Sequence, residues 1–283
     1  MEEETESTVF KRHTEHQPGR SWRRFLIGRP LSTADAPHQT VGKLIGLAIF
    51  SSDAMSSVAY APQEILIILA VAGMASFNLS VPIAIAICIL LAILVFSYEQ
   101  TIHAYPNNGG SYIVARDNLG ALPAQIAAAA LLTDYILTVA VSISSGVAQL
   151  VSAFPILEAQ KVLISVAFVF LIMMVNLRGL KESGFTFSIP TYFFLFMMYL
   201  NLIIGFVRLI LGTLGVVDTP PLDLMAEQEV LQPVTLFLIL KAFASGTSAL
   251  TGVEAISNGI TAFKEPRSKN AGKTLIIMAL VLG

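Results

Sequence analysis

The chain has 283 residues, of which 55% are hydrophobic and only 13% are charged, and its formal net charge is −2 at pH 7. The charged share is about half that of an ordinary soluble domain, which excludes that class and indicates an integral membrane protein. The single cysteine, Cys88, excludes an internal disulfide and a metal site built from several cysteines.

The first 40 residues are polar, with an acidic start followed by basic residues. They contain no apolar core of the kind that a signal peptide requires. We therefore predict a flexible cytoplasmic tail over 1–40 and a transmembrane transporter domain over 41–283.

Several apolar stretches of the chain are long enough to cross a hydrocarbon core of about 30 Å as helices. We also expect a short re-entrant or interfacial helix over Ser111–Leu119, and a seventh helix that starts near Lys273. Because the chain ends at Gly283 within that element, we expect it to be the N-terminal fragment of a longer transporter. The six predicted spanning helices cover residues 41–71, 80–102, 121–153, 157–177, 185–214 and 231–263.

The first and sixth predicted helices are interrupted at mid-length by small residues that include a carboxylate. The first interruption, 50–60, contains Asp53, and the second, 244–259, contains Glu254. Loosened helix survives inside a bilayer only where it lines a protein-enclosed cavity, and a pair of such breaks indicates the binding site of a transporter. We expect interrupted hydrogen-bond ladders near Ser52–Ser57 and Ser245–Gly252, with Ser52, Ser56, Gly246 and Gly252 as helix-break residues.

Loop charges predict the orientation of the chain in the membrane. Of the 17 lysines and arginines, 14 lie on the side of the N-terminal tail, whereas the loop between the fifth and sixth helices carries only acidic charges. The positive-inside rule then places the N-terminus in the cytoplasm. The two interrupted helices are five spans apart and so run in opposite directions, as a five-helix inverted repeat requires.

Three carboxylates lie at membrane depth: Asp53, Asp134 and Glu254. A charge at the bilayer centre costs about 2.5–3.5 kcal/mol on insertion scales, so each needs a partner or a wet cavity. Asp134, Thr138 and Ser142 are four residues apart and share one helix face. There are two alternatives. Asp53 is a protonated residue with a structural role only, and the stripe of hydroxyls serves only in helix packing. The candidate substrate-binding residues are Asp53, Tyr60 (as a gate), Asp134, Thr138, Ser142, Thr251 and Glu254.

Three motifs together resemble the amino acid–polyamine–organocation (APC) superfamily of permeases over about 41–283. They are YPNNGGSY at 105–112, NLRGLKES at 176–183 and GVEAISN at 252–258. Within the superfamily, the stretch FSSDAMSSVAY at 50–60 most resembles the bacterial potassium–proton symporters related to the Kup uptake systems. The resemblance implies an all-α membrane protein with a LeuT-like fold, broken helices 1 and 6, and truncation in helix 7. It also implies secondary active transport.

The residues favour a cation as substrate. A monovalent cation suits three carboxylates and the oxygens around them, whereas the carboxylate of an amino acid would be repelled by Asp53. We therefore expect a potassium importer of the cell membrane, coupled to protons by alternating access. An amino acid or polyamine permease is the alternative, and a non-transporting membrane sensor is a third class.

We expect neither an enzyme nor a cofactor, because the sequence contains no nucleophile elbow and no cysteine and histidine ligand cluster. No metal is expected beyond the transported cation. The expected partners are that cation, protons and the lipid bilayer, and no nucleic acid is expected. The sequence leaves open whether the protein forms a homo-oligomer.

Overall fold

The computed structural model describes Gly28 and residues 39–107, 110–215 and 233–283. Within these ranges the regular elements are helices, accompanied by an isolated bridge between Val41 and Phe263. The predicted tail lies almost entirely outside the described residues, as do the acidic residues of the loop after the fifth helix. The elements are α2 (Lys43–Phe50), α3 (Ser52–Ala70), η3 (Met74–Leu79), α4 (Ser80–Ala104), α5 (Ser111–Leu119), α6 (Ala121–Ala153), η4 (Pro155–Gln160), α7 (Lys161–Asn176), α8 (Leu180–Ile210), α10 (Leu236–Gly246), η5 (Thr247–Leu250), α11 (Ala255–Asn258), η6 (Ile260–Ala262) and α12 (Arg267–Leu282).

Among the described residues, five helical stretches are long and apolar enough to cross a membrane, and the bent pair α2 and α3 makes a sixth. This agrees with the six predicted spans. The prediction differs for α8, which begins at Leu180 rather than at residue 185. The charged residues Lys181 and Glu182 form its first turn, where the helix dipole favours an acidic side chain such as Glu182.

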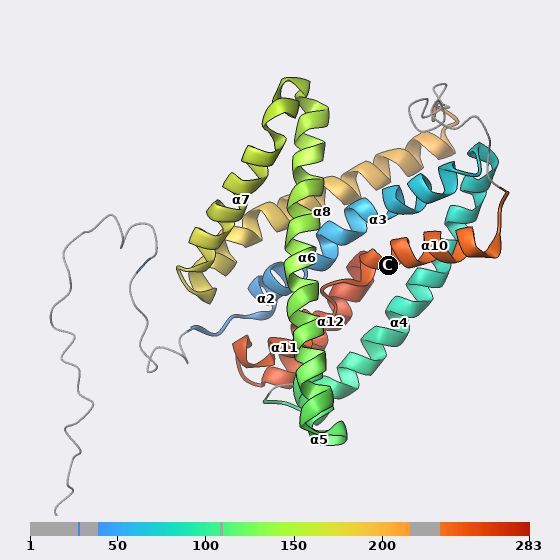
Figure 1. The fold of residues 1–283 in the computed structure, drawn as a ribbon. Helices are drawn as coiled ribbons and strands as arrows, with labels where there is room; N and C mark the ends of the chain where they lie inside the picture. The colour runs from blue at the N-terminus through green and yellow to red at the C-terminus, as the bar shows by residue number, and fades with distance from the viewer. Residues whose placement is uncertain (1–27, 29–38, 108–109, 216–232) are drawn as a thin grey trace, which may run out of the picture.

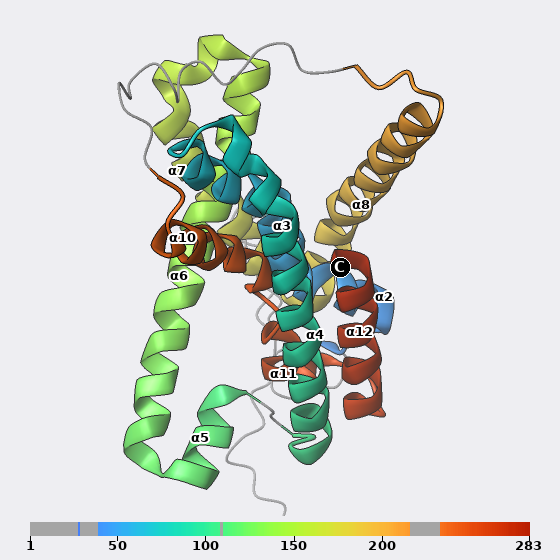
Figure 2. The ribbon, with the colours of Figure 1, turned by 90° about the vertical axis from the view of Figure 1, so that its right-hand side faces the viewer.

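The helices pack through two buried clusters. One joins α4 to α12 and to the segment around α11, and includes Leu91, Ile256 and Leu275. The other joins α3, α4 and α10, and includes Ile65 and Ile83. Figures 1 and 2 show α12 between α2 and α4, and the long helix α6 running down one side of the molecule with α5 at its end. The apolar outer faces of α6, α7 and α8 are exposed, as suits helices that face lipid.

The first broken span bends at Ser51, where the axes of α2 and α3 meet at 44°. The Ser51 hydroxyl donates to the carbonyl of Leu47, one turn earlier. Such back-bonding by serine competes with the helix ladder and bends helices. The prediction of loosened backbone over Ser52–Ser57 is wrong, because α3 resumes at Ser52 and continues through Ser56. The serine run therefore marks a kink at its first residue, and the rest of the run is helical.

The second broken span is interrupted over a longer stretch. α10 ends at Gly246, a 3-10 turn follows, and Thr251 is extended with φ −61° and ψ 150°. Gly252 then has a φ of 78°, in the left-handed region, before α11 begins at Ala255. The chain thus leaves and re-enters helical geometry at membrane depth, as expected for this span.

Candidate cation-binding site

The two broken spans touch at Asp53 and Gly252. A Cβ atom added to Gly252 would lie 2.9 Å from the Ala54 nitrogen and from Oδ2 of Asp53. A second link lies one turn further along α3, where the Ser57 and Thr251 hydroxyls are 2.5 Å apart. The extended backbone at Thr251 is what brings its side chain against α3. The kink in one span and the break in the other therefore form one junction.

Asp53 lies in the first turn of α3, with its carboxylate at this junction. Its Oδ1 atom is buried and has no hydrogen-bond partner among the described residues. A buried unpaired acceptor costs about 1–3 kcal/mol, and more when it is charged. The positive end of the α3 dipole offsets part of this cost. A carboxylate oxygen left without a donor inside a membrane protein is available to a cation.

The stripe on α6 faces the same region along part of its length. Ser142 is half-buried, and its hydroxyl lies 3.2 Å from that of Ser56 on α3. Thr138 is half-buried and Asp134 is exposed. Asp134 nevertheless lies close enough to Asp53 for the two carboxylates to interact electrostatically. The stripe therefore approaches α3 at Ser142 and carries a second carboxylate near Asp53.

Glu254 lies just beyond the junction and is surrounded by donors. It accepts hydrogen bonds from the Tyr98 hydroxyl at 3.2 Å, from the Asn258 amide at 3.4 Å, and from both the backbone and the hydroxyl of Ser111. The Asn258 amide also donates to the Tyr135 hydroxyl, 2.7 Å away. Unlike Oδ1 of Asp53, both carboxylate oxygens of Glu254 accept hydrogen bonds from protein donors.

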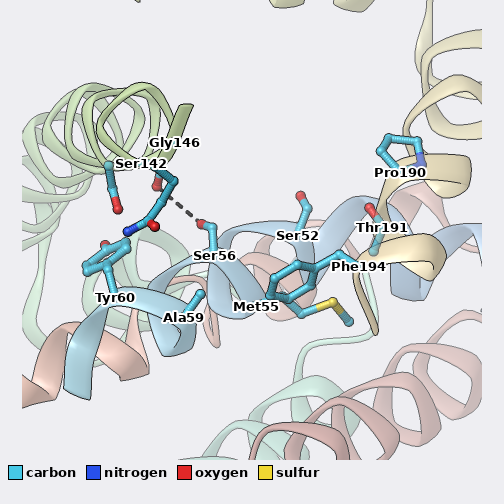
Figure 3. A pocket seen from close by; sticks show the side chains of 12 residues that line it. Ser52, Met55, Ser56, Ala59, Tyr60, Ser142, Gly146, Pro190, Thr191 and Phe194 are labelled. Atoms are coloured by element: carbon cyan, nitrogen blue, oxygen red, sulfur yellow. Dashed lines mark hydrogen bonds between the residues drawn. The ribbon is translucent and has the colours of Figure 1, made fainter. Parts of the chain in front are cut away.

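A cavity of about 340 Å³ lies between α3, α6 and α8. Figure 3 shows the Ser52 and Ser56 hydroxyls on the α3 face that borders it, with Tyr60 at one end and Pro190 and Thr191 of α8 at the other. Of the candidate residues, Tyr60 and Ser142 line this cavity, and the helix-break candidates Ser52 and Ser56 do so too. The lining residues do not include Asp53, Asp134, Thr138, Thr251 or Glu254, and the assignment of these five residues to a substrate site stays a prediction.

Sequence reasoning did not assign Tyr98, Ser111, Tyr135 or Asn258 to the site. Asn258 lies one turn after Glu254, and Tyr135 follows Asp134 directly, so local spacing could have found these two. Tyr98 and Ser111 come from elements far from Glu254 in the chain, and only the fold brings them together. Among the described residues there is no group of three or more histidine, cysteine and acidic side chains that could hold a metal ion.

Among the described residues, six apolar spans, two of them broken and in contact at Asp53, indicate a multi-pass membrane protein. The amino acid permease family matches residues 39–283, and the chain belongs to this family, whose members share the LeuT-like fold of the APC superfamily. The potassium transporter KimA of Bacillus subtilis (strain 168) is 49% identical over 262 residues. The match covers 93% of this chain and 42% of that relative, so the chain spans less than half of the relative's length.

Proposed function

We propose that the protein is a secondary active transporter that imports potassium together with protons by alternating access. The observation that carries this proposal is the unpaired, buried Oδ1 of Asp53 at the junction of the two broken spans. The relative named as a potassium transporter supports the same substrate. A dehydrated monovalent cation needs several oxygen ligands, and the junction offers the carboxylate of Asp53 and the hydroxyls of Ser57 and Thr251.

Each candidate residue has a role in this proposal. Asp53 supplies the charge that offsets the loss of the cation's water, and Asp134 adds a second carboxylate nearby. Tyr60 is buried, and its hydroxyl lies 3.1 Å from that of Ser57. We assign its ring the role of a gate on the path along α3. The hydroxyls of Thr138, Ser142 and Thr251 are the neutral ligands of the cation. Glu254 responds when the cation occupies the site.

The test is uptake of rubidium, as a tracer for potassium, by full-length protein in vesicles. We expect Asp53→Asn to reduce uptake to background, because the amide keeps the size of the side chain but removes its charge. Stability should hold or rise, since the substitution removes a buried charge. Glu158→Gln is the matched control, because Glu158 of η4 pairs with Lys161 of α7, away from the junction. Near-normal uptake by Asp53→Asn would exclude the ligand role.

The family's description as amino acid permeases favours a second candidate, an amino acid or polyamine permease. A polyamine is cationic and would also bind near Asp53 and Asp134. Competition separates the two functions: excess unlabelled potassium, but neither spermidine nor a mixture of amino acids, should suppress rubidium uptake. Saturable uptake of labelled spermidine or an amino acid that potassium does not inhibit would favour the second candidate.

The cellular setting belongs to the same proposal. We infer a location in the plasma membrane, with the N-terminus and the segment 1–40 in the cytoplasm, because basic residues are concentrated in the loops on that side. The partners are the cation, protons and the lipid bilayer. A homo-oligomer is compatible with the exposed apolar faces of α6, α7 and α8.

A further inference from the structure

The carboxylate of Glu254 caps the N-terminus of α5. Ser111 is the first residue of α5, and both its backbone N–H, at 3.2 Å, and its hydroxyl donate to Oε1 of Glu254. The preceding residue, Gly110, has no side chain that could serve as a cap. An anion at this position satisfies a free N–H of the first turn and interacts favourably with the helix dipole. The segment that follows the break of the sixth span is thereby tied to α5.

The two carboxylate oxygens of Glu254 accept different numbers of hydrogen bonds. Oε1 accepts from the Ser111 backbone, the Ser111 hydroxyl and the Asn258 amide, whereas Oε2 accepts from the Tyr98 hydroxyl. A carboxylate oxygen offers about two lone-pair sites, so three donors fill Oε1. A cation can therefore ligate Oε1 only by displacing a donor, and Ser111 supplies two of the three.

The same cluster connects four helices. α5 packs against α6, as Figure 2 shows, and Asn258 of α11 donates to Tyr135 of α6. Tyr135 follows Asp134 and lies within electrostatic range of Asp53, Asp134 and Glu254. A change at the Glu254 carboxylate is therefore transmitted to α5 through Ser111 and to Tyr135 of α6 through Asn258.

We propose that Glu254 and Ser111 form a latch that holds α5 against the broken sixth span and opens when a cation ligates Oε1 of Glu254. Ser111 is then a positioning residue for transport, and α5 is the element that moves. The identity of the opening cation rests on the proposed function. The latch itself rests on the hydrogen bonds at Ser111.

The test follows the accessibility of α5 in the full-length protein. The reporter is Ala115→Cys, at a half-buried position of α5, in a Cys88→Ala background, and the readout is the rate of maleimide labelling. In this background we expect slow labelling without potassium and labelling about tenfold faster with saturating potassium. That factor corresponds to about 1.4 kcal/mol. Equal labelling rates with and without potassium, in protein that takes up rubidium, would overturn the proposal.

Ser111→Pro opens the latch without a ligand. Proline is favoured at the first position of a helix, and the extended backbone of Gly110, with φ −73° and ψ 157°, accommodates a following proline. The substitution removes both donors of Ser111, and its ring occupies the position of the lost N–H bond. We expect fast labelling with and without potassium. Labelling as slow as in the background would overturn the latch. Ser111→Ala keeps the N–H donor, and we expect an intermediate rate.

Two further variants control for general loosening. Ser188→Ala removes a hydroxyl that donates within its own helix α8, and it should label like the background. Tyr98→Phe removes the donor to Oε2, and it should label at close to the background rate, because both Ser111 donors that hold α5 stay in place. A rate as high as that of Ser111→Pro would assign the restraint to Tyr98 and overturn the latch.

Rubidium uptake, measured on the same preparations, separates the two proposals. Fast labelling of Ser111→Pro in potassium-free buffer tests the latch whatever the substrate is. If that result holds while the background protein takes up no rubidium, the transport proposal fails and the latch stands.

Discussion

Gly252 is the residue on which the junction depends. Its φ of 78° lies in the left-handed region, which side chains other than glycine rarely adopt. An added Cβ would also lie 2.9 Å from backbone and side-chain atoms of α3, including Oδ2 of Asp53. The backbone of α3 cannot yield as the tip of a side chain can, so a larger residue at 252 must push the two broken spans apart.

We expect Gly252→Ala to abolish rubidium uptake and to lower the free energy of unfolding by about 1–3 kcal/mol, from backbone strain and overpacking. Gly212→Ala is the matched control, because Gly212 has a φ of 66° with open space around its Cβ position. The free energy of unfolding of this variant should fall by about 1 kcal/mol because of backbone strain, and its rubidium uptake should be unchanged. Uptake per folded protein and thermal unfolding in detergent measure both effects. Equal loss of uptake in the two variants would mean that strain alone is responsible.

For single residues, the sequence identifies those that are unusual, but it predicts only some of their contacts. Asp53 and Glu254 stand out because a charge in an apolar span is costly, whatever the fold. Their environments differ, with Oδ1 of Asp53 unpaired in the described structure and Glu254 surrounded by donors. Helical periodicity relates residues three or four apart, so it reaches Asn258 but not Tyr98 or Ser111.

At the scale of elements, the sequence locates the two broken spans, while the form of each break depends on local hydrogen bonding. A run of serines predicts loosened helix, yet the bend is confined to Ser51, and the backbone is helical again from Ser52 onward. The second break is longer because Thr251 is extended and Gly252 is left-handed, so helix resumes only at Ala255. The composition of the sequence indicates where each helix break lies, and the φ and ψ angles of individual residues determine its geometry.

The close approach of α2 and α8 depends on a small residue. A Cβ on Gly184 of α8 would lie 2.4 Å from Cδ1 of Ile49 on α2, and such small residues let membrane helices pack closely. We expect Gly184→Ala to destabilise the protein by about 1–3 kcal/mol through overpacking. Ile49→Ala should restore part of this loss in the double variant, with an interaction energy of about 0.5–3 kcal/mol in a double-mutant cycle of thermal unfolding.

Gly205→Ala, on the same helix, is the control for this pair. The space around Gly205 is open, so alanine should raise stability slightly by its better helix propensity. Additive effects of Gly184→Ala and Ile49→Ala would contradict the close contact between α2 and α8.

At the scale of the molecule, the number of spans and their pairing follow from the sequence because bilayer thickness fixes the length of an apolar helix. The lateral arrangement does not follow in the same way. Lipid tails are as apolar as leucine, so the exposed faces of α6, α7 and α8 carry no pattern that distinguishes lipid contact from helix contact. The contacts of α12 with α2 and α4 therefore come from the structure alone.

The orientation of the molecule in the membrane can be tested through two positions near opposite ends of its spans. Ala75 lies in η3, between the first and second spans, and Lys269 lies at the start of α12, and both are exposed. Because most basic residues lie on the side of Lys269, the positive-inside rule places this side in the cytoplasm. In a Cys88→Ala background, a membrane-impermeant maleimide added to intact cells should label Ala75→Cys and leave Lys269→Cys unlabelled until the cells are permeabilised. The reverse pattern would place the basic loops outside and overturn the proposed orientation.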